Sequence, residues 1–557
     1  MPILQFIDIK FEAMKRLFLF LFLLSAYSLN AVVTGAATRS DSLAAAEAKV
    51  LFEKGLSAYR LGDYDVAVKN WTKAAKKGNA NAQCNLGSCY AKGLGVKRDE
   101  RKAFDWYSKS ALQGNDVAQC NLGNCYLKGR GVNQDVYKAV DLFILSSNQG
   151  NLAALTSLGV CYKLGEGIEQ DYKEAVECFA YAACEGFASA QNELGDCYYA
   201  GTGIEQNVEE AVYWYTKAAE QGHAVAQRSL GVCYDNGEGV EPDKSKAAEL
   251  YRKAAEQNDA EAQYFLAECY YTGSGVEADH KEAVRWYVKA AEQGHTDALY
   301  FLGGCYYSGD GVEQNYRRAA ICFREAAEKG DLDAMCQLAG CYYYGDGVGA
   351  DIERAVELYE KASEAGHAES MFYLAECYNN GYGVEQNSHR ALLWYSESAK
   401  LDYAPAENAV GWFYYCGVEV KQDSCMAFEL FSLAAEKGLP DAQLNLGNCY
   451  YHGFGVEQDY ITAARWFIKA AEKGNVPAQF NLGVMYNKGL GVEQSYEESV
   501  KWYRLAAEAD YPMAQYDLGV CYYYGYGVPE DRNEAVRWWR KAAEQELEEA
   551  RRALKDL

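Results

Sequence analysis

Cysteine is the residue type in this chain whose number and spacing most suggest covalent chemistry, with 19 copies. Eleven of them recur at one position of a 36-residue period: Cys89, Cys125, Cys161, Cys197, Cys233, Cys269, Cys305, Cys341, Cys377, Cys449 and Cys521. So many cysteines in an exported chain would suggest disulfides. Equivalent residues of stacked helical hairpins lie about 10 Å apart, whereas a disulfide needs Cα atoms within about 7 Å. We therefore expect small buried core residues. Local bridges remain an alternative for six irregular cysteines: Cys178, Cys184, Cys322, Cys336, Cys416 and Cys425.

The six histidines do not have the spacing of metal ligands. His223, His295 and His367 share one position of the period but lie two repeats apart, which corresponds to roughly 20 Å in a helical stack. The chain has no Cys-x-x-Cys pair and no His-Glu-x-x-His motif. We therefore predict surface histidines, and neither a metal site nor a cofactor.

Motifs for hydrolysis and phosphate binding are missing as well. The chain contains no Ser-x-x-Lys and no Gly-x-Ser-x-Gly nucleophile motif. Its Gly-x-Gly loops lack the third glycine, the Lys-Ser/Thr pair and the preceding strand that phosphate loops require. The sequence therefore predicts that the loops are turns and that there is no catalytic site.

The elements that position all these residues come from the repeat itself. The pattern A-x-x-x-L-G-x-C-Y-x-x-G-x-G-V-x-x-D-x-x-x-A-x-x-W-Y-x-x-A-A occurs thirteen times at a strict 36-residue spacing. Its apolar spacing predicts a first helix over about 81–91, and Gly93 and Gly95 end it. Asp99 is a good N-cap for a second helix that runs to about Gly114. Each copy is thus a helical hairpin, which must stack on its neighbours to be stable.

Small residues inside the helices predict how each hairpin packs. Gly87 and Ala103 are expected where the two helices cross closely, because a mid-helix glycine otherwise costs about 1 kcal/mol against alanine. Residues 49–78 form a related hairpin with a connection about four residues shorter. Residues 547–557 are expected to be a charged C-terminal capping helix.

The N-terminal segment reads as an export signal. Lys15 and Arg16 precede an apolar run over 17–24, followed by small and polar residues to Ala31 and Ala37. The run is well short of the ~20 residues that span a bilayer. We assign 1–37 to an extension and signal peptide and 38–48 to a linker and the start of the first helix. The expected location is periplasmic or secreted, without a stable membrane span. The alternatives are the endoplasmic reticulum lumen and a retained anchor.

The net charge of −25 is spread along the repeats. Such a surface repels nucleic acid and anionic lipid, and it favours neutral or basic partners. The alternative is that the charge serves only the solubility of a long solenoid.

These residues resemble the Sel-one-like repeat family, a relative of the tetratricopeptide repeat. The L-G-x-x-Y, G-x-G-V and W-Y-x-x-A-A elements carry the resemblance over about residues 79–546, and the first hairpin resembles a plain tetratricopeptide repeat. The resemblance implies an all-α, right-handed superhelical solenoid of about fourteen hairpins that acts as a scaffold or adaptor. Some secreted, cysteine-rich members have been connected with β-lactam binding or weak β-lactamase activity, but their paired cysteines are mostly missing here.

In tetratricopeptide-like arrays the first helix lines the concave surface, so a partner would lie there. The positions of Cys84, Asn85 and Ser88 vary between copies and share one helix face. Later copies place aromatic, charged and amide residues on this face. The candidate partner-binding residues are Asn192, Arg228, Tyr264, Glu268, Tyr300, Phe372, Glu376, Asn408, Trp412, Phe480 and Tyr516. Packing between repeats is the alternative role for each of them.

The tenth full copy departs most from the pattern. It has Trp412 and Phe413 on its first helix, and Glu419 replaces the second loop glycine. A left-handed backbone at Glu419 would cost about 1–2 kcal/mol, which suggests a local kink or a contact point.

Together these features predict a non-enzymatic protein–protein scaffold or adaptor that binds a protein or peptide along the concave face. The alternatives are a secreted protein with β-lactam binding or weak β-lactamase activity, and a glycan or peptidoglycan binder.

Overall fold

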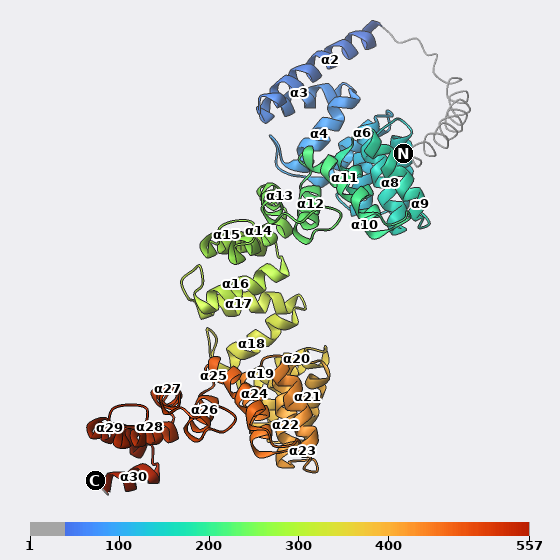
Figure 1. Ribbon diagram of the computed structural model, residues 1–557. Coiled ribbons are helices and arrows are strands. Elements are labelled where there is room, and N and C mark those ends of the chain that lie inside the picture. The colour runs from blue at the N-terminus through green and yellow to red at the C-terminus, as the bar shows by residue number, and fades with distance from the viewer. Residues whose placement is uncertain (1–38, 556–557) are drawn as a thin grey trace. The chain divides into compact units, whose positions relative to one another are not determined.

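The computed structural model describes residues 39–555, and all regular structure in this range is helical. The described residues form two compact units, which divide between Gln293 and Gly294. Within each unit, every helix packs on the helix before it and the helix after it along the chain (Figure 1). This pattern of contacts is that of a repeat solenoid of about 14 hairpins, as the sequence predicts.

Even-numbered helices are the first of each hairpin and are called helix A; odd-numbered helices are called helix B. The first unit contains α2 (Arg39–Arg60), α3 (Tyr64–Lys76), α4 (Ala80–Lys92), α5 (Glu100–Ala111), α6 (Asp116–Lys128), α7 (Val136–Ser147), α8 (Leu152–Leu164), α9 (Tyr172–Cys184), α10 (Ala188–Ala200), α11 (Val208–Glu220), α12 (Ala224–Asn236), α13 (Lys244–Glu256), α14 (Ala260–Thr272) and α15 (His280–Glu292).

The second unit continues the same alternation and ends in α30, which has no partner helix B. It contains α16 (Thr296–Ser308), α17 (Tyr316–Glu328), α18 (Leu332–Tyr344), α19 (Ile352–Glu364), α20 (Ala368–Asn380), α21 (Ser388–Lys400), α22 (Ala404–Cys416), α23 (Ser424–Glu436), α24 (Pro440–His452), α25 (Tyr460–Glu472), α26 (Val476–Lys488), α27 (Tyr496–Glu508), α28 (Pro512–Tyr524), α29 (Arg532–Glu544) and α30 (Glu548–Lys555).

Local capping sets the ends of the helices, as predicted. Helix α4 ends at Gly93, whose backbone is left-handed with φ 73°. The carboxylate of Asp99 accepts the Lys102 N–H at 3.0 Å, and its own N–H donates to the Tyr90 carbonyl at 2.9 Å. The N-cap is confirmed at all thirteen positions: Asp99, Asp135, Asp171, Asn207, Asp243, Asp279, Asn315, Asp351, Asn387, Asp423, Asp459, Ser495 and Asp531. Local sequence therefore determines where each hairpin turns.

The predicted close crossing within each hairpin is also confirmed. Gly87 is buried, and a Cβ there would lie 2.8 Å from the Tyr107 ring and 3.2 Å from the Ala103 carbonyl oxygen. The ring of helix B thus lies directly on the backbone of helix A. Glycine costs helix propensity here, but it allows a large aromatic side chain to be fully packed.

The second loop glycine joins consecutive hairpins. A Cβ on Gly95 would lie 2.4 Å from the carbonyl oxygen of Tyr64, the first residue of the preceding helix B. A Cβ on Gly131 would lie 2.2 Å from the Glu100 carbonyl oxygen in the same way. Backbone therefore meets backbone between neighbouring repeats, and no side chain fits between them.

A buried hydrogen-bond ladder, which the sequence analysis did not foresee, links three helices in many repeats. Gln83 donates to the Ala75 carbonyl of the preceding helix B at 3.1 Å and accepts from Gln113 at 2.7 Å. The amide-to-amide bond recurs in six pairs: Gln83–Gln113, Gln119–Gln149, Gln191–Gln221, Gln227–Gln257, Gln263–Gln293 and Gln515–Gln545. One repeat replaces the pair by the ion pair Lys437–Glu407 at 2.5 Å, with Glu407 only 2% exposed.

Several expectations can be compared directly with the structure. All eleven repeat cysteines are buried thiols, and none of the nineteen cysteines forms a disulfide. The first hairpin has the shorter connection, although its helix α2 already begins at Arg39. The capping helix is present as α30. The expected signal over 1–37 lies outside the described residues. Within them, no helix combines the length and apolar character that crossing a bilayer requires.

We predict that Gly455→Ala lowers the melting temperature more than Gly474→Ala does. Both glycines have positive φ, 73° and 84°, so each alanine carries about 1–2 kcal/mol of backbone strain. Only at Gly455 does the new Cβ also meet backbone, 2.0 Å from the Ser424 carbonyl oxygen, whereas nothing lies within 4 Å at Gly474. Overpacking adds a further ~1–3 kcal/mol. Thermal unfolding followed by circular dichroism measures both; equal shifts would contradict the joint described above.

Candidate binding face

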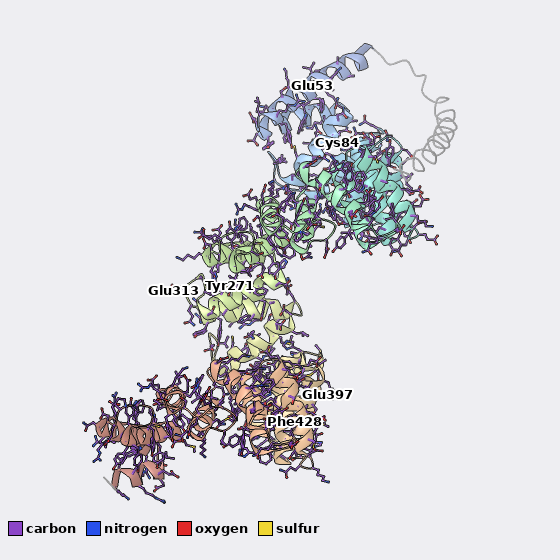
Figure 2. The ribbon with its side chains drawn as sticks, viewed as in Figure 1. Glu53, Cys84, Tyr271, Glu313, Glu397 and Phe428 are labelled. Atoms are coloured by element: carbon purple, nitrogen blue, oxygen red, sulfur yellow. The ribbon has the colours of Figure 1, made fainter. Side chains whose placement is uncertain are left out.

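The helix-A face consists of the side chains at the variable positions of Cys84, Asn85 and Ser88 and their equivalents on the even-numbered helices; Figure 2 shows the side chains and labels Cys84. The structure buries two of the candidate residues on it, Asn192 at 4% and Phe480 at 9% exposure. Trp412 is 51% exposed. The other candidates are half-buried: Arg228, Tyr264, Glu268, Tyr300, Phe372, Glu376, Asn408 and Tyr516. The face is therefore shared between packing and solvent, and Trp412 is its most exposed candidate.

The acidic candidates are hydrogen-bonded to buried tyrosines. Glu268 accepts from the hydroxyl of Tyr287, and Glu376 accepts from that of Tyr395. The burial of Tyr395, together with the Glu376 carboxylate, raises the pKa of its hydroxyl. These carboxylates balance a buried hydroxyl of helix B, which accounts for an acid at this position without a ligand.

The polar candidates also have partners within the stack. Arg228 pairs with Asp259 of the next repeat at 3.1 Å. Asn408 accepts from Asn445 at 2.9 Å. Asn192 donates to Asp196 at 3.2 Å. A partner protein would have to compete with these contacts.

The aromatic candidates pack against the ring of helix B in their own hairpin. Ring centroids lie 6.2 Å apart for Tyr264 and Tyr287 and 5.6 Å apart for Phe372 and Tyr395. The same contact occurs for three further pairs: Tyr300–Phe323, Phe480–Tyr503 and Tyr516–Trp539. The packing alternative therefore describes these rings, and all except Phe480 still present part of their surface to solvent.

Trp412 differs from the other aromatic candidates because its ring stacks on Tyr415 of its own helix and not on a ring of helix B. Its ring lies 5.2 Å from that of Tyr415 at an interplanar angle of 24°. Tyr415 in turn meets Phe454, from the loop of the next repeat, edge to face at 5.6 Å. Phe454 is 38% exposed. We call Trp412, Tyr415 and Phe454 the aromatic strip; it spans two repeats on the helix-A side.

The loop beside the aromatic strip carries the strain that the sequence predicts. Glu419 has φ 61°, a left-handed backbone that glycine adopts in the other copies. Its carboxylate lies 3.7 Å from the ring of His389 at the start of the preceding helix B. A depression of about 600 Å³ adjoins this loop. Its lining residues are Tyr414, Val420, Lys421, Gln422, Asp423 and Ser424.

A row of tyrosines near the end of helix A was missed by the sequence analysis. Tyr199 and Tyr307 donate to loop carboxylates of the next repeat, Glu238 at 2.5 Å and Asp346 at 2.7 Å. Tyr415 of the aromatic strip occupies the same position and meets Phe454 instead. The signal was available, since a second aromatic residue follows the repeat tyrosine in many copies.

The expectation that the repeat histidines are surface residues needs correction. His223, His295 and His367 are half-buried N-caps of helix A, and the ring of each accepts a backbone N–H in the first turn. Burial lowers the pKa of His223. These histidines replace the Asn or Asp found at this position in other copies, a substitution that the sequence comparison had not interpreted.

Stacked helical hairpins of this kind define a tetratricopeptide-like α/α solenoid protein. The chain belongs to the Sel1 repeat family, whose model matches fourteen consecutive segments: 43–79, 80–115, 116–151, 152–187, 188–223, 224–259, 260–295, 296–331, 332–367, 368–403, 404–439, 440–475, 476–511 and 512–547. The first hairpin, which resembled a plain tetratricopeptide repeat, is thus matched as a Sel1 repeat. Proteins of this family typically mediate protein–protein interactions and are generally non-catalytic scaffolds.

Solved structures of bacterial proteins are similar to this chain. The antigen c5321 of uropathogenic Escherichia coli is 34% identical with a TM-score of 0.59, over 75% of this chain and 91% of that one. A Sel1 repeat protein of Oxalobacter formigenes is 33% identical with a TM-score of 0.42, over 54% and 87%. Cysteine-rich protein B of Helicobacter pylori is 29% identical with a TM-score of 0.20, over 23% and 92%. No curated protein matches the chain.

One further carboxylate on the helix-A face, that of Asp517, has a raised pKa. Burial raises its pKa to about 6, while the hydroxyl of Tyr503 and the charge of Lys488 partly offset the shift. The folded chain therefore binds a proton more tightly than the unfolded chain between about pH 4 and 6. Stability falls as pH rises through this window, and the cost is fully present at neutral pH.

We predict that Asp517→Asn stabilises the chain at pH 7 by on the order of 1–2 kcal/mol and has little effect at pH 4. Asparagine keeps an acceptor for Tyr503 without the buried charge. Asp459→Asn is the control, because the helix N-cap contacts lower the pKa of Asp459, so its substitution brings no gain at neutral pH. Urea unfolding at the two pH values measures the difference; a gain that is independent of pH would contradict the assignment.

Proposed function

We propose that this protein is an exported scaffold that binds a protein or peptide partner through its helix-A face, with the aromatic strip as the anchor. The observation that carries the proposal is Trp412, a 51% exposed tryptophan on a face where the other candidate rings pack against helix B. Exposed tryptophan and tyrosine dominate binding energy at protein interfaces. The Glu419 loop directly follows α22, the helix that carries Trp412 and Tyr415, and the depression lies against this loop.

The chemistry of the partner follows from charge and from the rings. The net charge of −25 favours a neutral or basic segment over an acidic one. A flat, exposed indole stacked on a tyrosine accepts an aliphatic, aromatic or guanidinium group on its face. We therefore favour a peptide segment that combines a basic residue with an apolar anchor.

Export rests on the sequence of residues 1–37, with its basic residues, apolar run and small residues. The similar protein c5321 is described as a protective antigen, which supports an exposed location for a relative of this chain. We propose a periplasmic or secreted scaffold.

The test is a crosslinking pull-down with the chain from residue 38 onward, read by mass spectrometry, followed by affinity measurement on the partner found. We expect Trp412→Ala to weaken binding at least tenfold, as interface tryptophans typically do. Tyr213→Ala is the control, because Tyr213 is equally exposed at 51% but lies on helix B. Unchanged affinity in Trp412→Ala would remove the aromatic strip from the proposal. Retention by cell-wall material, in place of a protein, would favour glycan binding.

A further inference from the structure

The N-caps of helix A form a second ladder between repeats. The side chain of the N-cap reaches the second residue of the preceding helix A: Asn115 donates to Asn81 at 2.8 Å, and Asn475 donates to Asp441 at 2.8 Å. At α20 the same contact is made by an imidazole, with His367 Nε2 lying 3.1 Å from a carboxylate oxygen of Asp333. The geometry of the repeat thus places a histidine ring against an acidic side chain.

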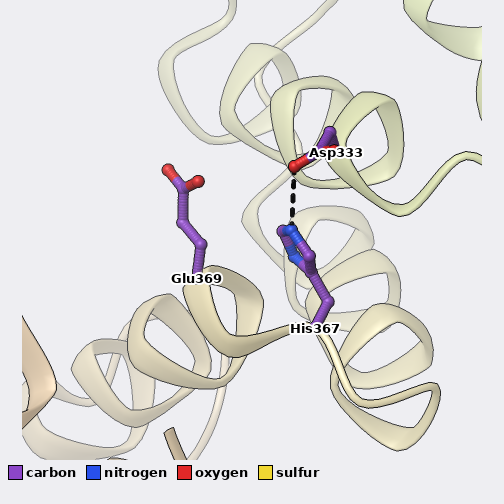
Figure 3. A group of neighbouring side chains, drawn as sticks. All are labelled: Asp333, His367 and Glu369. Atoms are coloured by element: carbon purple, nitrogen blue, oxygen red, sulfur yellow. Dashed lines mark hydrogen bonds and ion pairs between the residues drawn. The ribbon is translucent and has the colours of Figure 1, made fainter. Parts of the chain in front are cut away.

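A second carboxylate completes the group. Glu369 occupies in α20 the position that Asp333 occupies in α18. One ligand atom of each of Asp333, His367 and Glu369 lies within 4.8 Å of the other two. Figure 3 shows the imidazole pointing at Asp333, with Glu369 rising beside the pair from the same helix end. Two neighbouring repeats therefore direct one nitrogen and two carboxylates to one point.

The negative charge of this group is not balanced by any cation from the described part of the chain. Within residues 39–555, His367 is the only basic group in contact with Asp333, and Glu369 makes neither a hydrogen bond nor an ion pair. Four neutral side chains among the described residues lie within electrostatic range of Glu369: Tyr300, Tyr373, Tyr403 and the buried thiol of Cys336. A bound divalent cation would balance the charge of the two carboxylates.

The other ring nitrogen of His367 is held in place. Nδ1 lies 2.8 Å from the hydroxyl of Ser370 and 3.3 Å from its backbone N–H. Metal binding at Nε2 requires the ring proton on Nδ1, which then donates to the Ser370 hydroxyl and gives up the cap bond from the Ser370 N–H. Histidine ligands in metal sites are usually oriented by such a bond on the other nitrogen.

We propose that Asp333, His367 and Glu369 bind a divalent transition-metal ion, with Zn²⁺ as the best fit, across α18 and α20. One imidazole and two carboxylates with a free fourth position form an open zinc site. Zn²⁺ bonds of about 2.0–2.2 Å require ligand atoms roughly 3.4 Å apart, so small side-chain rotations would close the present spacing. The site would clamp consecutive repeats in the second unit. It departs from the prediction of no metal site, which rested on the spacing of the histidines and on the missing Cys-x-x-Cys and His-Glu-x-x-His motifs.

The experiment uses the chain from residue 38 onward, alkylated in every variant because Cys184, Cys416 and Cys425 are exposed thiols that bind zinc. We expect one Zn²⁺ per chain in competition with a chromophoric chelator, and a rise in melting temperature when Zn²⁺ is added. In Co²⁺-loaded protein we expect the absorption of a four-coordinate site. Failure to bind Zn²⁺ at micromolar concentration would overturn the proposal.

The decisive variant is His367→Asn. Asparagine caps α26 at Asn475 and makes the same bond to an aspartate, so the fold should be kept while the imidazole ligand is lost. We expect His367→Asn to lose the site and Glu369→Gln to weaken it at least tenfold. His223→Asn is the matched control, since Nε2 of His223 lies 3.4 Å from the hydroxyl of Ser189, whereas Nε2 of His367 lies against the carboxylate of Asp333. Wild-type zinc stoichiometry and affinity in His367→Asn would overturn the site, whereas a partner lost only in Trp412→Ala would bear on the proposed function alone.

Discussion

The architecture depends on direct backbone contact between consecutive hairpins. At the second loop glycine the missing Cβ would lie 2.2 Å from a carbonyl oxygen in the Gly131–Glu100 pair, closer than any side chain permits. A single 36-residue hairpin buries too little surface to be stable, so its hydrophobic core is completed only by close contact with the neighbouring hairpins. Glu419 shows the exception: with a side chain at this position, the loop keeps its left-handed backbone and carries strain.

Much of the fold was predictable because it is encoded within a few residues. The left-handed turn at Gly93 and the cap at Asp99 depend on local backbone preferences. The Gly87–Tyr107 crossing follows from one small and one large residue at fixed positions. The ladders were not predictable in the same way. The Gln83–Gln113 bond and the His367–Asp333 contact depend on the offset between packed helices, which a single sequence does not state.

The candidate face illustrates the same limit. Variation between copies selected one helix face, but it did not separate residues that could contact a ligand from residues that pack within the stack. Glu376 accepts the hydrogen bond of the buried Tyr395 hydroxyl, and Phe372 packs on the ring of the same tyrosine. Trp412, whose ring stacks on Tyr415 of its own helix, is the most exposed of the candidate residues. Whether a side chain on this face is exposed therefore depends on the residue it packs against, which the sequence pattern did not reveal.

Consecutive hairpins are joined through main-chain carbonyl groups, which every residue possesses. Gln83 bonds to a main-chain carbonyl of the preceding helix, and Gly95 rests on another. The charged substitute Glu407 finds its partner Lys437 inside its own hairpin. If a whole hairpin were duplicated or deleted, the hairpins on either side would therefore still make the same contacts with their new neighbours. Gain or loss of whole repeats in the gene can change the length of such a chain without compensating substitutions in the repeats that remain.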